Sequence, residues 1–172
     1  FVTYGGMSGR DLEALAIGLQ EGIEEDYLEY RIEQVKYLGD QLLSKGIPII
    51  VPAGGHGIYV DAKKFYPHIP QKEFPGQALV VELYKTGGVR GVELGSCAFS
   101  KKNMNTGEII YPELEMVRLT VSRRIYTNRH MDVVVNSLED VYKRRDSARG
   151  LKITYEGPII SLRHFTAKFK LL

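Results

Sequence analysis

The chain has 172 residues and a formal net charge of +2, and its 44% hydrophobic and 26% charged residues are typical of one globular domain with a core. This nearly balanced charge lacks the excess of basic residues that is typical of a nucleic-acid-binding protein. The sequence also has no apolar run long enough to cross a membrane. The single cysteine, Cys97, excludes an internal disulfide and indicates a reducing compartment, so we expect a cytoplasmic protein. Because the chain starts at Phe1 without an initiator methionine, we interpret it as a processed chain, an engineered piece or a fragment of a longer protein.

Apolar residues at helical spacing predict helices between residues 9 and 45, with Ser8 and Asp11 near the first helix start. We expect a break or kink near 22–27, because Gly22 and three consecutive acidic residues separate two apolar stripes. The stripes consist of Leu12, Leu15, Ala16, Leu19 and Ile23, and of Leu28, Ile32, Val35, Leu38 and Leu42.

The remainder of the chain mixes strand and helix patterns, which predicts an α+β fold with a largely antiparallel sheet and helices packed on one side. Helices are expected from Gln77 to about Gly87, and from Thr127 as N-cap to about Arg149. Strands are expected over 47–52, 58–60, 89–99, 116–121, 151–155 and 161–171.

Arg118 lies in the middle of an apolar strand pattern, where a permanently charged guanidinium needs a partner. One interpretation is a structural ion pair with Glu113, Glu115 or another acid of the same chain. The other is a ligand carboxylate, held by two parallel N–H···O bonds.

Two glycine-rich stretches give weaker signals. The loop Tyr4-Gly5-Gly6 precedes a helix and can hold an anion at the helix N-terminus, although it lacks the full phosphate-loop pattern. His56 lies in a glycine-rich turn, where a ligand or base role competes with an ordinary hydrogen-bonded one. The four histidines show no metal-ligand spacing with each other or with Cys97, so we predict no metal site in this chain.

Separated blocks of the sequence, in the same order, resemble the β-eliminating lyases, the family of tryptophanase and tyrosine phenol-lyase. The resemblance covers almost the whole chain, from about Thr3 to Phe169. The blocks are Thr3-Tyr-Gly-Gly-Met, Pro52-Ala-Gly-Gly-His-Gly, Tyr66-Pro-His-Ile-Pro-Gln, Val89-Arg-Gly-Val-Glu, Val117-Arg-Leu-Thr-Val and Arg163-His-Phe-Thr-Ala-Lys-Phe.

The resemblance implies the C-terminal part of a fold type I enzyme that uses pyridoxal 5'-phosphate and a potassium ion and acts as a homotetramer. Residues 1–45 would be a helical segment that links to a missing large domain, and residues 46–172 the small C-terminal domain. The family's Schiff-base lysine belongs to a segment that precedes this chain, so we expect the piece alone to be inactive. Ser122 replaces a proline that is usual in the family.

The resemblance also suggests roles for single residues. Arg118 matches the arginine that binds the substrate α-carboxylate. Leu94 matches a position that is aliphatic in tryptophanase and arginine in tyrosine phenol-lyase, and His164 matches a tryptophanase histidine near the indole. Tyr4, Gly5 and Gly6 would lie near the cofactor phosphate of a neighbouring subunit. For Leu94 the alternative is core packing, and for His164 it is a place on the surface or on the face of a strand.

The resemblance therefore implies a lyase that converts L-tryptophan to indole, pyruvate and ammonia. A lyase acting on tyrosine, or on another β-substituted amino acid, is the alternative within the family. A domain that binds an anion and assembles with a partner, without catalysis, is the alternative from another class.

Overall fold

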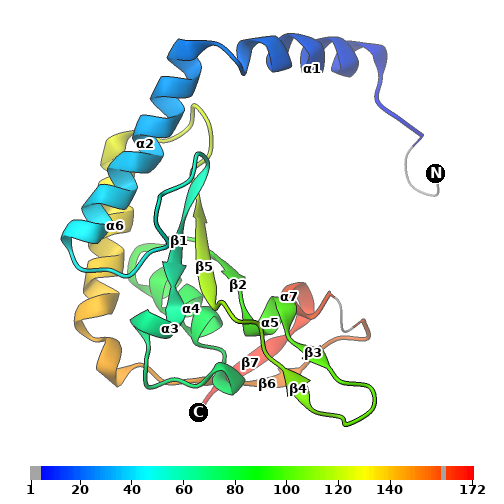
Figure 1. Ribbon diagram of the computed structural model, residues 1–172, viewed down its shortest axis with the longest axis vertical. Helices are drawn as coiled ribbons and strands as arrows, with labels where there is room; N and C mark the ends of the chain where they lie inside the picture. The colour runs from blue at the N-terminus through cyan, green and yellow to red at the C-terminus, as the bar shows by residue number, and fades with distance from the viewer. Residues whose placement is uncertain (1–4, 160–161) are drawn as a thin grey trace.

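A three-stranded antiparallel sheet lies at the centre of the structure, a computed structural model that describes residues 5–159 and 162–172. Strand β5 (Met116–Thr120) is the middle strand, between β1 (Gly57–Asp61) and β2 (Val92–Leu94). Figure 1 shows the three strands side by side. The predicted strand around Arg118 is therefore confirmed, and it is the strand with neighbours on both sides.

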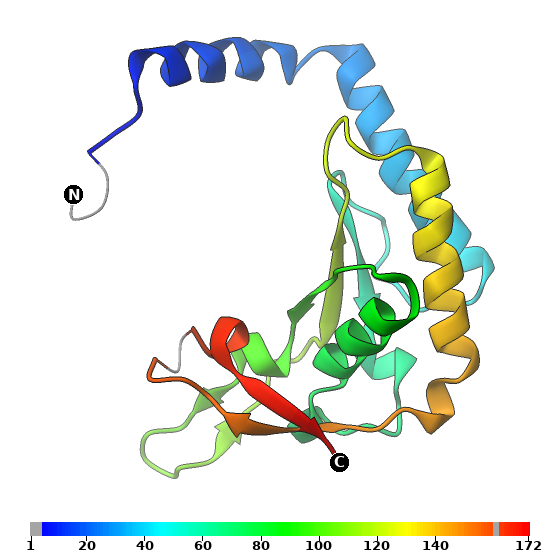
Figure 2. The same ribbon diagram turned by 180° about the vertical axis from the view of Figure 1, so that it is seen from behind.

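One face of this sheet forms the core with three helices. Val117 and Leu119 of β5 are buried, whereas Met116 and Arg118, which alternate with them, are half-buried on the opposite face. The core face contacts α2 (Glu25–Ser44) and α4 (Pro75–Gly87), and both of these helices also pack on α6 (Asn128–Lys143). Figure 2 shows this helical layer from behind. The predicted α+β arrangement with antiparallel strands is confirmed.

The N-terminal helical region breaks where the sequence predicts a break. Helix α1 (Gly9–Glu21) ends at Gly22, and α2 starts three residues later at Glu25. The core includes Val35, Leu38 and Leu42 of α2, on the N-terminal side of the predicted domain boundary at residue 45. The boundary itself stays a prediction.

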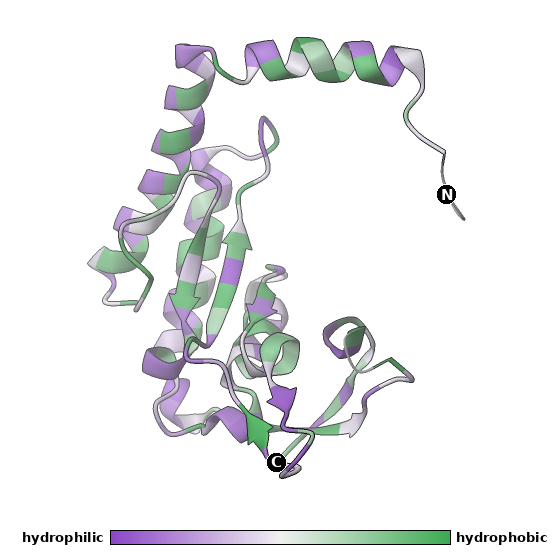
Figure 3. Ribbon diagram, turned by 45° about the vertical axis from the view of Figure 1, so that its right-hand side comes forward, coloured by the Kyte–Doolittle hydropathy of each residue, from purple (hydrophilic) through white to green (hydrophobic). Residues whose placement is uncertain are grey.

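Helix α1 buries none of its residues against the remainder of the described chain. It projects away from the sheet, and Figure 3 shows hydrophobic residues along it. Leu19 is 65% exposed and Ile23, just beyond the helix, is 78% exposed, so this apolar stripe packs on nothing in the structure.

Short elements connect and flank this core. Two further antiparallel pairs, β3 with β4 and β6 with β7, lie beyond the central sheet. The short elements are α3 (Ala62–Phe65), η1 (Gln71–Glu73), α5 (Ser96–Phe99), β3 (Lys101–Lys102), β4 (Ile109–Ile110), η2 (Arg145–Ser147), β6 (Leu151–Tyr155), α7 (Arg163–Thr166) and β7 (Lys168–Leu171). None of the described helices is both long enough and apolar enough to cross a lipid bilayer.

Three predicted elements differ from the structure. The strand expected over 47–52 forms only one bridge, Ile49 to Val60, because the flanking prolines, Pro48 and Pro52, have no N–H to donate to a ladder. Val92–Leu94 is the only strand within 89–99, since the chain turns at Gly95 into α5. The second half of 161–171 is strand β7, but its first half holds the helical turn α7.

The helix after the central strand begins as predicted and ends early. Thr127 is the N-cap of α6, and it forms a reciprocal capping box with His130. The helix ends at Lys143 rather than near Arg149, and the 3-10 turn η2 follows.

Candidate substrate-binding site

Arg118 occupies the middle of the central strand on the face away from the core. In the register of the sheet it lies between Tyr59 of β1 and Val92 of β2. Its Nε atom is buried, and among the described residues it has no hydrogen-bond partner. A buried donor without an acceptor is costly, so this Nε–H is available to donate a hydrogen bond to a bound ligand.

The structure does not support the predicted ion pair within the chain. Glu115 is buried in a different set of contacts, where its carboxylate accepts from the Gly76 N–H at 3.2 Å and from the Ser96 N–H at 2.8 Å. Glu113 contributes its backbone carbonyl to the Lys63 ammonium. Within residues 5–159 and 162–172, no carboxylate lies within ion-pair distance of Arg118.

Leu94 shares a sheet face with Arg118. It lies opposite Met116, two pairs along the ladder from the pair of Val92 with Arg118. Side chains two residues apart on one strand point to the same face, and diagonal neighbours of an antiparallel pair are roughly 7–8 Å apart. Leu94 is half-buried, so part of its apolar surface remains open on the sheet face that it shares with Arg118.

His164 lies elsewhere in the fold. It belongs to the turn α7, is exposed, and packs its ring on Phe165 at a centroid distance of 3.7 Å. A strand-face position is wrong, because α7 interrupts the alternating pattern, whereas the surface position that was the other alternative agrees with its exposure. No described contact joins His164 to Leu94 or Arg118; α7 instead contacts α5, the turn that follows β2.

The structure describes only part of the glycine-rich loop before α1. Tyr4 lies outside the described residues, and Gly5 and Gly6 are exposed before α1. Ser8 is the N-cap residue of α1, but its hydroxyl donates to the Asp11 carboxylate at 2.7 Å and makes no bond to the helix backbone. A phosphate role for this loop stays a prediction.

His56 is hydrogen-bonded, since its Nε2 lies 3.1 Å from the Tyr59 hydroxyl. This contact agrees with the ordinary hydrogen-bonded role for His56, the alternative to a role as ligand or base. Among the described residues, no cluster of three or more His, Cys, Asp or Glu side chains could hold a metal ion.

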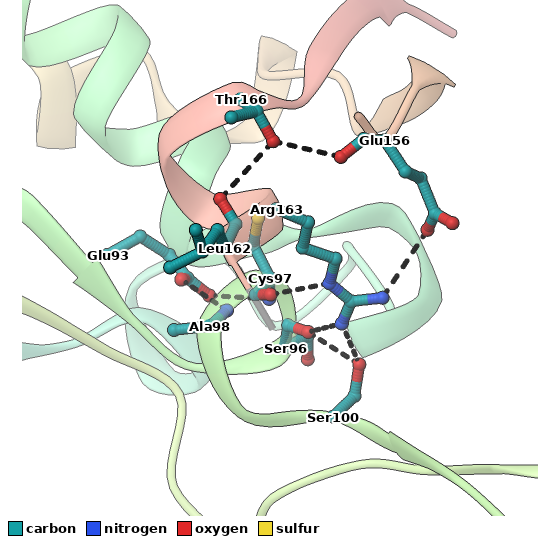
Figure 4. Close-up of polar contacts among 9 residues, drawn as sticks. All are labelled: Glu93, Ser96, Cys97, Ala98, Ser100, Glu156, Leu162, Arg163 and Thr166. Atoms are coloured by element: carbon teal, nitrogen blue, oxygen red, sulfur yellow. Dashed lines mark hydrogen bonds and ion pairs between the residues drawn. The ribbon is translucent and has the colours of Figure 1, made fainter. Parts of the chain in front are cut away.

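A buried arginine, Arg163, is not identified from the sequence. Its Nε donates to the Cys97 carbonyl at 2.7 Å, and its Nη2 donates to the Ser96 carbonyl at 2.7 Å and to the Ser100 hydroxyl (Figure 4). Its Nη1 lies 3.5 Å from the Glu156 carboxylate. No sequence signal predicts these contacts, because two of the four partners are backbone carbonyls and three lie more than sixty positions away.

Two buried carboxylates lie at the other end of the same turn. Glu93 accepts from the Cys97 N–H at 2.9 Å and from the Ala98 N–H at 3.0 Å. Burial raises the pKa of Glu93 to about 7, and the nearby charge of Glu115 adds to the rise, against the two N–H bonds that lower it. Burial likewise raises the pKa of the Cys97 thiol to about 12.

The chain also matches known proteins. The sequence model of the family "Beta-eliminating lyase" matches residues 15–137. The chain belongs to the β-eliminating lyase family. The match includes Leu94 and Arg118 and ends before His164.

Relatives of both kinds within the β-eliminating lyases align with nearly the whole chain. A tyrosine phenol-lyase of Symbiobacterium sp. (strain SC-1) is 54% identical over 98% of this chain and 36% of its own length. A tyrosine phenol-lyase of Nostoc punctiforme is 52% identical over 98% of this chain and 36% of its own. A tryptophanase of Salinibacter ruber is 48% identical over 99% of this chain and 35% of its own. The chain therefore spans about a third of the length of these lyases.

Proposed function

We propose that the protein containing this chain is a pyridoxal-phosphate-dependent carbon–carbon lyase that cleaves L-tryptophan to indole, pyruvate and ammonia. The observation that carries the proposal is Arg118, whose buried Nε has no described partner at the centre of the sheet. A substrate α-carboxylate supplies the two acceptors that a guanidinium fork binds best. Such a charge-assisted pair contributes about 1.5–3 kcal/mol and fixes the orientation of the substrate Cα–H bond.

Leu94 supports tryptophan as the substrate. A half-buried leucine on the same face as Arg118 offers hydrocarbon to the leaving ring of a substrate whose carboxylate is held at Arg118. An indole has an apolar edge that suits this surface, whereas a phenol oxygen needs a polar partner there. His164, on the neighbouring turn α7, is proposed to complete the ring pocket.

A tyrosine phenol-lyase activity is the second candidate. The observation that favours it is the identity of 54% and 52% to two proteins of that name, against 48% to a tryptophanase. Overall identity averages over the whole chain, whereas substrate choice depends on the few residues around the ring. The proposal of tryptophan therefore rests on Leu94 and His164.

The described residues offer groups that could bind the substrate of such an enzyme, but no lysine in surroundings suited to its cofactor. Pyridoxal phosphate acts as an electron sink once it is joined to the substrate amine, and it is held by a lysine in an enclosed pocket. All twelve lysines of the chain are exposed, so none has such surroundings. We propose that another part of the protein supplies the lysine and that these 172 residues alone do not catalyse. Potassium binding, a homotetramer and a cytoplasmic location stay predictions.

The test is product analysis with the full-length protein, supplied with pyridoxal phosphate and potassium. Separate incubations with L-tryptophan and L-tyrosine are assayed for indole, phenol and pyruvate. We expect indole and pyruvate, with the higher kcat/KM for L-tryptophan. A higher kcat/KM for L-tyrosine, with phenol released, selects the second candidate, and the absence of pyruvate from both refutes a lyase of this kind.

A further inference from the structure

The turn α5 is too short to be stable alone, because one helical turn fixes several residues for very few hydrogen bonds. Side chains complete it at both ends. Glu115 and Glu93 accept the N–H groups of residues 96–98, and Arg163 donates to the carbonyls of residues 96 and 97. The carboxylates lie at the N–H end and the guanidinium at the carbonyl end, which is the favourable arrangement of charges for a helical turn.

These three buried ionisable residues hold the same turn. Glu93 is 5%, Glu115 1% and Arg163 9% exposed, so solvent cannot replace any of them. Loss of Arg163 would leave the Cys97 carbonyl without the guanidinium donor that it has in the described structure, and the Ser96 carbonyl with the Ser100 hydroxyl and N–H alone. We call Arg163, Glu93, Glu115 and the turn they hold the α5 clamp.

The clamp joins parts of the chain that carry the two proposed ring-pocket residues. Leu94 directly follows Glu93, and His164 directly follows Arg163. The two segments are about seventy residues apart in sequence, and the contacts of Arg163 with residues 96, 97 and 100 connect them (Figure 4). Arg118 and Leu94 are both placed by the ladder of the central sheet, whereas His164 lies in α7, outside that sheet.

We propose that Arg163 is a positioning residue that selects the leaving group, because it fixes α7 with His164 against the turn that follows Leu94. The inference rests on the proposed function. The clamp holds the leaving-group side of the substrate site as one body, while the carboxylate side depends on the sheet. Loss of the clamp therefore lowers kcat/KM for substrates whose leaving group is a large ring. It spares substrates whose leaving group is too small to reach the proposed ring pocket.

The experiment compares two substrates in the full-length holoenzyme and its variants. L-tryptophan (or L-tyrosine, if the wild type prefers it) has a large leaving group, and S-methyl-L-cysteine has a small one. We expect Arg163→Met to lower kcat/KM for the aromatic substrate by about ten- to a hundredfold, because small displacements of residues that position a substrate have effects of this size. For S-methyl-L-cysteine we expect kcat/KM to fall by less than about threefold. Arg163→Lys, which keeps the charge but not the fork, gives a smaller loss in the same direction. Arg129→Met, on the exposed surface of α6, is the matched control.

A second readout does not depend on catalysis. Cys97 lies inside the clamp, 1% exposed, and its thiol should react very slowly with Ellman's reagent. Arg163→Met should speed the labelling of Cys97, identified by peptide mass, at least about tenfold through local opening of α5, with an unchanged circular dichroism spectrum. If Arg163→Met does not fold, Ser100→Ala removes one acceptor of Arg163 and should show both effects more weakly.

The outcomes separate the two proposals. A wild type that cleaves neither substrate refutes the proposed function, and Cys97 labelling then still decides whether Arg163 joins α5 to α7. An active wild type whose Arg163→Met variant loses both substrates equally, or loses neither, overturns the role in selectivity. Unchanged labelling of Cys97 in that variant overturns the clamp.

Discussion

Glu93 should make the stability of the protein fall as the pH rises from about 5 to about 7. Its carboxyl has an ordinary pKa of 4.5 in the unfolded chain and a pKa of about 7 in the folded one. Between these values the folded protein holds a proton that the unfolded chain has lost. This contribution is therefore fully present below pH 4.5 and is lost as the pH passes about 7.

The magnitude follows from the two pKa values. A difference of one pKa unit corresponds to 1.36 kcal/mol, so the gap between 4.5 and about 7 amounts to about 3 kcal/mol in total. Most of it, about 2 kcal/mol, lies between pH 5 and pH 7.5. Glu93→Gln removes the titrating group and should remove this part of the pH dependence.

The assay is urea unfolding at pH 5 and pH 7.5, followed by circular dichroism. The wild type should lose about 2 kcal/mol more stability over this interval than Glu93→Gln does. Glu82→Gln is the control: the Lys85 ammonium lowers the pKa of Glu82 below 4.5, so this variant should keep the wild-type pH dependence. Parallel curves for wild type and Glu93→Gln would refute the reasoning.

Three further predictions concern the surface, the cofactor and the substrate. The exposed stripe of α1 should make the 172-residue chain self-associate, and Leu12→Gln with Leu19→Gln should reduce this in sedimentation at tens of micromolar; a wild type that is a clean monomer and binds no apolar dye would contradict it. The same chain, incubated with pyridoxal phosphate and desalted, should keep no imine absorbance, and a stable band that borohydride reduces on one of its own lysines would show otherwise. In the full-length protein, Leu94→Arg with His164→Phe should shift the ratio of kcat/KM from tryptophan toward tyrosine, because an arginine without a partner beside indole costs about 1–3 kcal/mol and can pair with a phenol oxygen. An unchanged ratio would count against the ring-pocket assignment.

Local patterns predicted the elements whose own residues determine them. Gly22 and the acids after it interrupt two apolar stripes, so the break between α1 and α2 could be read directly. Thr127 before an amphipathic run predicted the start of α6, and the apolar run around Arg118 predicted β5.

The errors lie where distant contacts override a local pattern. The alternation after residue 161 is typical of a strand, but Arg163 binds the carbonyls of Ser96 and Cys97, and a helical turn forms there instead. The start of α5 is likewise set by Glu93 and Glu115, which accept backbone N–H groups that no sequence pattern identifies.

The same difference separates the site residues. Arg118 could be recognised because a cation in an apolar strand is anomalous by itself. Leu94 could be placed on its face by strand alternation and register. Arg163 carries no such anomaly, since an arginine in a polar, alternating segment looks like an exposed one.

The most direct test of the account is the effect of Arg118→Gln in the full-length protein. The kcat/KM values for L-tryptophan and S-methyl-L-cysteine are measured in wild type, in Arg118→Gln and in Arg123→Gln, which alters an exposed arginine near the same strand. Because both substrates carry the same α-carboxylate, the account predicts that Arg118→Gln lowers kcat/KM for both alike, by about ten- to a hundredfold, through the loss of about 1.5–3 kcal/mol. A loss confined to one substrate, or a loss no larger than that of Arg123→Gln, would contradict the assignment of Arg118 to the carboxylate.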